Sequence, residues 1–435
     1  MAWLLALPAT LKILVAFVGI LVAHRLGVSL GLSILGSALF LTLWTGAGTH
    51  GLGLQLSAFL GAENLLLILD IVLLIQFIEA LSAGGRIARS VEALKRRLHS
   101  QRMTLAGLPA LVGLLPMPGG ALFSAPLVAT IDSENRIPPA QKVAINYWFR
   151  HIWEYWWPLY PGVILAIRYS GLPIATFLMI QLPLTLASIA GGRLFVLRGL
   201  PPERSISEAD QASVGEGNLA ATLGPVGLLV TISIVGSLAL PGLGIPSSLA
   251  SLLAMLAGLV LSCGWVLLAG ERSLRRPLRL AFSKVTGSLV LLLVGIQVFS
   301  AALQVPAGAA GATLVSLMRD DLFTLGVPIL AVMMLVPFLS GVVTGVAMGY
   351  VGASFPLVFA LLGTHAPLNQ VAATTSLAYA CGYMGMMLSP IHICFVVTGQ
   401  YFKSSPFRSY RFLLGPAVVV IVAALVLSAA YYRFL

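Results

Sequence analysis

Charged side chains are scarce in this sequence. Asp, Glu, Lys and Arg make up 9% of the 435 residues, whereas hydrophobic residues make up 59%. An ordinary soluble domain carries about 25% charged residues, and a surface with far fewer charges is poorly solvated by water. The scarcity excludes an extracellular soluble domain and a disordered tail. It predicts a protein whose solvent is the lipid bilayer.

Cysteine and the sequence motifs of enzymes are also scarce. Cys263, Cys381 and Cys394 lie in apolar runs without the spacing of a disulfide framework or a metal site, so we interpret them as small core residues. The sequence contains no HExxH and no Walker A pattern. His151 and Glu154 alone are too few ligands for a zinc site. We therefore expect no enzyme activity, no cofactor and no metal site, with Na⁺ entering only as an alternative coupling ion.

Positive residues outnumber negative ones, and their positions predict an orientation. The formal net charge of +11 would suggest a nucleic-acid partner in a soluble protein. In a membrane protein it is better explained by basic loops on the cytoplasmic side. The basic segments at 86–102, 272–284 and 403–411 are expected there, which places both termini outside. We expect a multi-pass protein of the cytoplasmic membrane with no nucleic-acid partner.

Ten apolar stretches are long enough to cross the bilayer as helices, which takes about 20 residues. They cover residues 8–23, 28–46, 64–83, 143–161, 172–196, 219–240, 248–269, 285–304, 372–398 and 411–432. Two further apolar stretches, 104–131 and 324–362, contain proline and glycine, which favours re-entrant hairpins of two half-helices. The sequence thus predicts an all-α polytopic membrane protein with about ten transmembrane helices and two re-entrant hairpins. The first stretch lacks the basic segment and cleavage site of a signal peptide, so we expect a retained helix.

Four short segments recur in the same order in the two halves. The pairs are LGVSLGLS (26–33) with LGIPSSLA (243–250), IQFIEAL (75–81) with IQVFSAAL (296–303), SAPLV (124–128) with SFPLV (354–358), and PLYPGVILA (158–166) with MLSPIHICF (387–395). Each match alone is weak, but the collinear set predicts repeats at 1–200 and 218–435, joined by a cytoplasmic linker at 201–217. Each repeat holds five spans, an odd number, so the second is inverted, as in many secondary transporters.

This arrangement resembles the ion transporter superfamily, which includes gluconate, citrate, C4-dicarboxylate and arsenite carriers. The resemblance rests on PMPGGALFSAPLV (116–128), on SGVVTGVAMGYVGASFPLV (340–358), and on a proline-broken helix after each. The segment NYWFRHIWEYWWPLYPG (146–162) is similar to an uncharacterised bacterial and archaeal membrane family within the superfamily. The resemblance implies a scaffold domain, a moving transport domain, an elevator movement and a homodimer. The tips here read Pro118-Gly119-Gly120 and Val343-Thr344-Gly345, where dicarboxylate carriers have Ser-Asn-Thr.

The two hairpin tips are the first candidate site. Glycine lets the backbone approach a ligand, and half-helix N-termini direct N–H groups and positive dipole ends towards an anion. The candidates for substrate binding are Pro118, Gly119, Gly120, Ser124, Thr344, Gly345 and Ser354. The alternative is that these small residues only permit close helix packing.

The two broken helices are the second candidate site. Pro161 and Pro390 remove helix hydrogen bonds and free backbone carbonyls, which can coordinate a cation or a substrate donor. Side chains near the breaks are candidates for substrate binding (Asn146, Thr375 and Ser389) or for the coupling ion or proton (Thr374 and His392). The alternative for the hydroxyls is a bond to their own helix.

Arg150, His151 and Glu154 lie close together in an apolar span. A charge at the centre of such a span costs about 2.5–3.5 kcal/mol on insertion scales. Arg150 is expected to receive the anionic group of the substrate, and His151 or Glu154 to carry a coupling proton. The alternative is a structural Arg150–Glu154 pair at i,i+4 spacing.

Other polar and aromatic residues complete the set. Asp70, near the middle of the third span, is a further candidate for the coupling proton or ion. The tryptophans at 148, 153, 156 and 157 favour an interfacial belt over a ligand box.

Together these features predict a secondary active transporter for a small anion or organic acid. Coupling to H⁺ or Na⁺ and elevator-type alternating access are expected, with a homodimer as the assembly. A lipid-handling protein (scramblase or flippase) or an intramembrane enzyme could use the same polar path, and a passive channel is a third possibility.

Overall fold

The computed structural model describes residues 7–82, 100–116, 120–201, 219–268, 283–306, 312–363 and 365–435. Across these ranges the chain is helical and forms no strand. Six helices are long and apolar enough to cross a membrane, and a bent pair of helices would make a seventh span. The predicted all-α multi-pass class is confirmed. Pro118 and Gly119, most of the basic segment 86–102, and most of the linker 201–217 lie outside the described residues.

The helices follow one another along the whole chain. The first half contains α2 (Ala9–Arg25), α3 (Leu30–Trp44), α4 (Gly48–Phe59), α5 (Ala62–Ser82), α7 (Gln101–Gly113), α8 (Gly120–Ile131), α9 (Pro139–Arg150), α10 (Pro161–Ser170) and α11 (Ile174–Gly191), which continues as the π-helical turn η2 (Gly192–Val196). The second half contains α12 (Leu219–Ala239), the 3₁₀ turn η4 (Leu240–Leu243), α13 (Ser247–Leu268), α15 (Lys284–Leu303), α16 (Leu314–Thr324), α17 (Ile329–Thr344), α18 (Ala347–Leu362), α19 (Leu368–Met387), α20 (Ile393–Tyr401) and α21 (Pro406–Phe434). Most predicted spans agree with these helices to within a few residues.

Two predicted spans are interrupted. The prediction of one helix over 143–161 is wrong, because α9 ends at Arg150 and α10 begins only at Pro161. The span at 372–398 is likewise divided into α19 and α20, with the break before Ile393. Pro161 occupies the first turn of α10, where its missing N–H has no helical partner to lose. The predicted proline breaks are therefore present, although the first unwound segment is longer than expected.

Both predicted hairpins consist of two helices. In the first hairpin α7 packs on α8, and in the second α17 packs on α18. The second turn passes through Gly345, whose φ of +63° is a left-handed conformation that favours glycine. The half-helices are thus confirmed, and their depth in a membrane stays a prediction.

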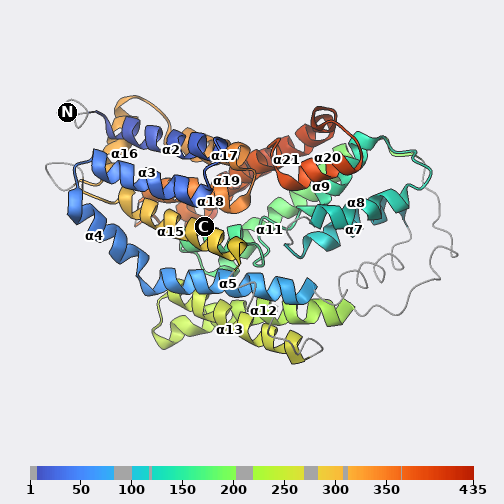
Figure 1. Ribbon diagram of the computed structural model, residues 1–435, viewed down its shortest axis with the longest axis horizontal. Helices are drawn as coiled ribbons and strands as arrows, with labels where there is room; N and C mark the ends of the chain where they lie inside the picture. Colours follow the sequence, from blue (N-terminus) through green and yellow to red (C-terminus); the bar gives the residue numbers. More distant parts are fainter. Residues whose placement is uncertain are drawn as a thin grey trace.

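Helices from the two halves pack on each other reciprocally. In Figure 1, α5, α12 and α13 lie together along one side of the molecule, with α15 next to them and α3 packed on the other side of α15. Contact pairs cross between the halves: α3 packs on α15, α13 on α5, α10 on α18, and α20 on α8. Each contact has a partner contact between the corresponding helices of the other half. Two repeats of the same fold would give this pattern. The pattern supports the division at 1–200 and 218–435, which stays a prediction.

Candidate functional site

The hairpin tips and the helix breaks meet in the interior. A Cβ added to Gly120, the first residue of α8, would overlap the guanidinium of Arg150 at the end of α9. A Cβ added to Gly345 would lie 3.2 Å from both the His392 backbone nitrogen and the Ser389 hydroxyl oxygen. Each tip therefore contacts a break directly. The glycines permit this close approach, and at Gly345 the φ of +63° also favours glycine.

Arg150 is buried, with 3% of its surface exposed. Its Nη1 donates to the Cys394 sulfur over 3.2 Å, a contact between residues 244 positions apart. Cys394 belongs to α20 of the second half. The guanidinium thus joins α9, the start of α8 and the start of α20. This is the arrangement that an internal anion-binding residue needs.

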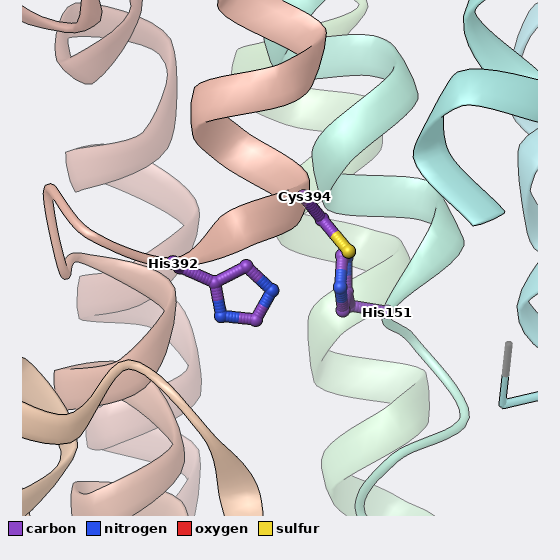
Figure 2. A group of neighbouring side chains, drawn as sticks. All are labelled: His151, His392 and Cys394. Carbon is purple, nitrogen blue, oxygen red and sulfur yellow. The ribbon is translucent and has the colours of Figure 1, made fainter. Parts of the chain in front are cut away.

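Three potential metal ligands surround this point. One ligand atom from each of His151, His392 and Cys394 lies within 4.8 Å of the other two, and all three side chains are buried. Figure 2 shows His392 and Cys394 entering from the start of α20, with His151 opposite them on the turn after α9. Two imidazoles and a sulfur form a donor set suited to a transition metal rather than to Na⁺ or Mg²⁺.

A hydrogen bond orients the His151 ring. His151 Nδ1 lies 2.5 Å from the Tyr147 carbonyl oxygen, so this nitrogen carries the proton and Nε2 keeps its lone pair. Glu154 Oε1 lies 3.7 Å from that Nε2. His392 turns its Nε2 towards His151 and Cys394 (Figure 2), while its Nδ1, on the far side of the ring, is buried without a hydrogen-bond partner among the described residues.

Arg150 and Glu154 do not lie on one helix, because α9 ends at Arg150. The predicted i,i+4 spacing on a shared helix is therefore wrong. Glu154 Oε1 lies 3.7 Å from His151 Nε2, and Arg150 donates to Cys394. Whether Arg150 and Glu154 act as a site or as a structural pair stays a prediction.

Tyrosines of α19 close the first break. The Tyr383 hydroxyl donates to the His151 carbonyl over 2.5 Å, and the Tyr379 hydroxyl donates to the Glu154 carbonyl over 2.6 Å. Tyr147 donates in the other direction, from α9 to the Met387 carbonyl over 3.1 Å. The sequence predicted free carbonyls upstream of Pro161 and Pro390 without naming them. These three carbonyls near the breaks accept hydrogen bonds within the protein.

Several predicted hydroxyl ligands bond to their own helices. Ser124, Thr344, Ser354 and Thr375 each donate to the carbonyl four residues earlier. Ser389 donates to the Val342 carbonyl of α17 over 2.6 Å, and Thr374 lies 4.0 Å from the Met333 sulfur. In this structure the first four hydroxyls therefore bond to their own helices, which is the alternative to substrate binding given above.

Asn146 connects the site to its neighbours. Its Nδ2 donates to the Thr398 hydroxyl over 3.0 Å and to the Ala121 carbonyl over 3.4 Å. These bonds link α9 to α20 and to α8. The Oδ1 atom has no hydrogen-bond partner in the described part of the chain, which leaves an acceptor beside the hairpin tip.

The sequence profile of a family described as "Protein of unknown function (DUF401)" matches residues 9–431. The chain belongs to this family. Comparison with curated protein sequences gives no match. Among solved structures, the chain is similar to the Alcanivorax borkumensis YdaH transporter, whose crystal structure is described as revealing an unusual topology. The similarity has a TM-score of 0.55 and 16% identity, and it covers 86% of each chain. At this identity it shows that the DUF401 chain shares the fold of a transporter.

Asp70 does not join the tips and breaks in this DUF401 protein. It is fully buried on α5, and neither carboxylate oxygen has a hydrogen-bond partner among the described residues. Helix α5 packs mainly on α13 and α15. Its part in coupling stays a prediction, at a position separate from the Arg150 cluster.

The tryptophans of 148–157 make internal hydrogen bonds, and an interfacial belt stays a prediction for the partly exposed Trp153, Trp156 and Trp157. Trp148 is buried and donates to the Ser188 carbonyl, and Trp156 donates to the Thr185 hydroxyl. Trp153 and Trp157 donate to carbonyls at the end of α7. The indoles act as internal hydrogen-bond donors that attach the first break to α7 and α11.

Sequence reasoning missed Cys394 and the tyrosines. Cys394 was interpreted as a small core residue, because the contact with Arg150 joins distant parts of the chain. A signal was present: Cys394 lies two residues after His392, inside the repeated segment MLSPIHICF. Tyr147, Tyr379 and Tyr383 gave no sequence signal that separates them from other apolar positions.

Proposed function

We propose that this DUF401 protein is a secondary active transporter that moves a small anion or organic acid across the cytoplasmic membrane. One observation carries the proposal: the buried guanidinium of Arg150 lies against Gly120 at the N-terminus of α8, where the first hairpin tip meets both helix breaks. The transporter fold shared with YdaH is consistent with it.

The charge of the site favours an anion. A guanidinium offers several N–H donors in a planar fork that matches a carboxylate or a similar group. The N-terminus of α8 adds backbone N–H groups and the positive end of the helix dipole. An anion at about 4 Å from a guanidinium gains about 4 kcal/mol at an effective dielectric constant of 20. Substrate binding would thereby offset part of the cost of burying Arg150.

Coupling to H⁺ or Na⁺ would balance the charge of the transported anion. His151, Glu154 and His392 are the candidates nearest to Arg150, with Thr374 farther along α19 and Asp70 on α5. Na⁺ is the alternative coupling ion, since carbonyl and hydroxyl oxygens near the breaks are the ligands that a hard cation uses. We also propose that the protein is a homodimer and that both termini lie outside the cytoplasmic membrane.

An elevator movement agrees with the layered contacts. The hairpins α7–α8 and α17–α18 pack on the broken helices α9–α10 and α19–α20. Helices α3, α5, α12, α13 and α15 pack on one another in a separate layer. The first group would slide as one transport domain along the second, carrying the Arg150 site across the membrane.

Uptake by the purified protein in liposomes tests the proposal. We expect saturable uptake of one class within an organic-acid panel, driven by an imposed H⁺ or Na⁺ gradient. Saturable uptake that ignores both gradients would contradict the coupling, and non-saturating flux would indicate a channel. Movement of fluorescent lipid between leaflets without solute uptake would favour the scramblase alternative.

A further inference from the structure

The cluster of His151, His392 and Cys394 contains more ligand atoms than anion binding requires. An anion needs hydrogen-bond donors, whereas these side chains present imidazole lone pairs and a sulfur. The three ligand atoms lie within 4.8 Å of one another, close to the span of one coordination sphere. Their convergence from two breaks, about 240 residues apart along the chain, requires a physical explanation.

The imidazoles are oriented as metal-binding histidines are. A ligating histidine usually donates its second ring N–H to a carbonyl or carboxylate, which fixes the tautomer. His151 meets this description, since its Nδ1 lies 2.5 Å from the Tyr147 carbonyl oxygen. His392 turns its Nε2 towards His151 and Cys394 (Figure 2), so this nitrogen would be the ligand atom. Its Nδ1, on the far side of the ring, is buried without a hydrogen-bond partner in the described ranges.

The surrounding charges select the kind of ion. Arg150 Nη1 donates to the Cys394 sulfur over 3.2 Å, an interaction that is stronger when the sulfur is a thiolate. The Glu154 carboxyl group lies 3.7 Å from His151 Nε2. If a cation displaces the protons of Cys394 and Glu154, the thiolate and the carboxylate against one guanidinium leave a net charge of −1 for the cation to neutralise. Two nitrogens and one sulfur bind Zn²⁺ and Cu⁺ in preference to Na⁺, Mg²⁺ or Ca²⁺.

We propose that His151, His392 and Cys394 bind a thiophilic transition-metal ion of the Zn²⁺ or Cu⁺ class at the junction of the two helix breaks. On binding, the Cys394 S–H bond breaks, its proton leaves to the solvent, and a sulfur–metal bond forms. The Arg150 N–H bond to sulfur remains. With Zn²⁺ the fourth position is filled by Glu154 or by an exogenous anion, whereas Cu⁺ is satisfied by three ligands.

This ion would tie the turn after α9 to the start of α20 and thereby join the two halves at the proposed site. Metal binding does not require that the protein transports an anion. The test therefore measures the metal directly, so that a failure of transport and a failure of metal binding are separate results.

The experiment uses the purified full-length protein in detergent. Zn²⁺ affinity is measured by competition with a chromophoric chelator, Cu⁺ affinity by competition under reducing conditions, and Co²⁺ replaces Zn²⁺ as a spectroscopic probe. We expect one equivalent of Zn²⁺ or Cu⁺ per chain, displaced by neither Na⁺ nor Mg²⁺. Bound Co²⁺ should show a thiolate-to-cobalt charge-transfer band.

Matched variants locate the site. Cys394→Ser and His392→Gln should each weaken metal binding at least 100-fold, and Cys394→Ser should remove the charge-transfer band. Cys381→Ser is the control, because Cys381 is also buried but lies outside the cluster. Cys263→Ser is a second control. Both controls should bind the metal as the original protein does.

A measurement on the unaltered protein gives a test that does not depend on whether the variants fold. Zn²⁺ should slow alkylation of Cys394, measured by peptide mass spectrometry, without changing the rate at Cys263. The proposal is overturned if no stoichiometric metal is bound, or if Cys394→Ser and His392→Gln keep the original affinity. It is also overturned if Zn²⁺ leaves Cys394 alkylation unchanged.

Discussion

At the scale of single residues, Arg150 is held by contacts from several elements. A Cβ added to Gly113 of α7 would overlap the backbone carbonyl oxygen of Arg150, so that α7 and α9 are in close contact there. The guanidinium of Arg150 lies against Gly120 of α8. The Cys394 sulfur accepts one of its N–H groups. Because a buried charge is tolerated only with partners, these contacts give Arg150 a fixed position before any substrate arrives. Preorganisation of this kind lowers the entropy lost on binding.

Replacement of Arg150 tests this position. Arg150→Lys keeps the charge but loses the planar fork, and Arg150→Ala loses both. A hydrogen bond to a charged group contributes about 1.5–3 kcal/mol, which corresponds to roughly 10- to 150-fold in affinity. We expect uptake in liposomes to fall at least about tenfold in the lysine variant and to be abolished in the alanine variant. Arg168→Ala, which removes a partly exposed pair with Glu63 at 2.8 Å, is the control and should retain uptake.

Gly120→Ala tests the contact between tip and guanidinium without removing a charge. The new methyl group would overlap the Arg150 guanidinium, so the side chain must leave the N-terminus of α8. We expect impaired uptake with nearly unchanged thermal stability, since the guanidinium is the flexible end of its side chain. Gly19→Ala is the control, because nothing lies within 4 Å of a Cβ at Gly19. Full uptake by Gly120→Ala would remove this contact from the mechanism.

The chemistry of the site could be predicted from the sequence only in part. Arg150, His151, Glu154 and His392 stood out because charged and imidazole side chains are rare in apolar spans. Cys394 was not recognised, because a lone cysteine in an apolar run is typical of a helix core, and its position two residues after His392 was the only signal. The hydroxyls of Ser124 and Ser354 were overvalued, since a chain position does not reveal whether a hydroxyl bonds to its own helix.

At the scale of elements, the unwound segment after α9 completes the end of α7. The last carbonyls of a helix lack intrahelical partners, and inside a bilayer no water replaces them. Trp153 donates to the Ala110 carbonyl, Trp157 to the Leu114 carbonyl, and the Tyr160 hydroxyl to the Gly113 carbonyl. The carbonyls of Leu111 and Val112 accept from the backbone of the following turn. The run of aromatic residues therefore caps a half-helix that ends inside the protein.

Trp157→Phe tests this cap. Phenylalanine retains an aromatic ring but cannot donate, so the Leu114 carbonyl loses its side-chain partner. Leaving one buried polar group unsatisfied costs about 1–3 kcal/mol. We expect a lower midpoint of thermal unfolding in detergent. Trp265→Phe, at a half-exposed position on α13, should change stability little. Equal midpoints for both variants would show that the indole bond does not stabilise the hairpin.

Hydropathy predicted the long helices because a run of about 20 apolar residues has few alternatives to a spanning helix. It failed where apolar character continues through a break. Five of the eight residues from Trp153 to Tyr160 are aromatic, and Pro158 comes well after the break, so hydropathy does not mark the end of α9 at Arg150. Helices α4, α10 and α16 were missed because each is too short to span, and α16 also carries Arg319, Asp320 and Asp321.

At the scale of the whole molecule, the reciprocal contacts support the repeat that the sequence suggested. The matched segments lie in corresponding elements: 75–81 in α5 and 296–303 in α15, 124–128 in α8 and 354–358 in α18. Inverted repeats allow alternating access, because each half can adopt the conformation of the other. Four short matches indicated the order of elements, but the sequence could not show which helices lie together, since these contacts join residues far apart in the chain.

The proposed elevator movement requires sliding between α15 and α18, and a cross-link there tests it. A Cβ on Gly352 of α18 would lie 2.7 Å from Ile296 Cγ1 of α15, so cysteines at both positions bring their Cβ atoms near the roughly 3.5–4.5 Å that a disulfide needs. We introduce Gly352→Cys with Ile296→Cys in a protein that carries Cys263→Ser and Cys381→Ser.

Oxidation of this pair should abolish uptake in liposomes, and a reductant should restore it, because the bond fixes the transport domain on the scaffold. The matched control is Gly258→Cys with Ser233→Cys, which joins α13 to α12 within one layer, where a Cβ on Gly258 would lie 3.3 Å from the Ser233 hydroxyl oxygen. Oxidation of the control pair should leave uptake unchanged, since both helices belong to the layer along which the transport domain slides. Full uptake by the oxidised α15–α18 pair would contradict sliding at this interface. Loss of uptake in both pairs would indicate that oxidation alone, and not the position of the bond, stops the protein.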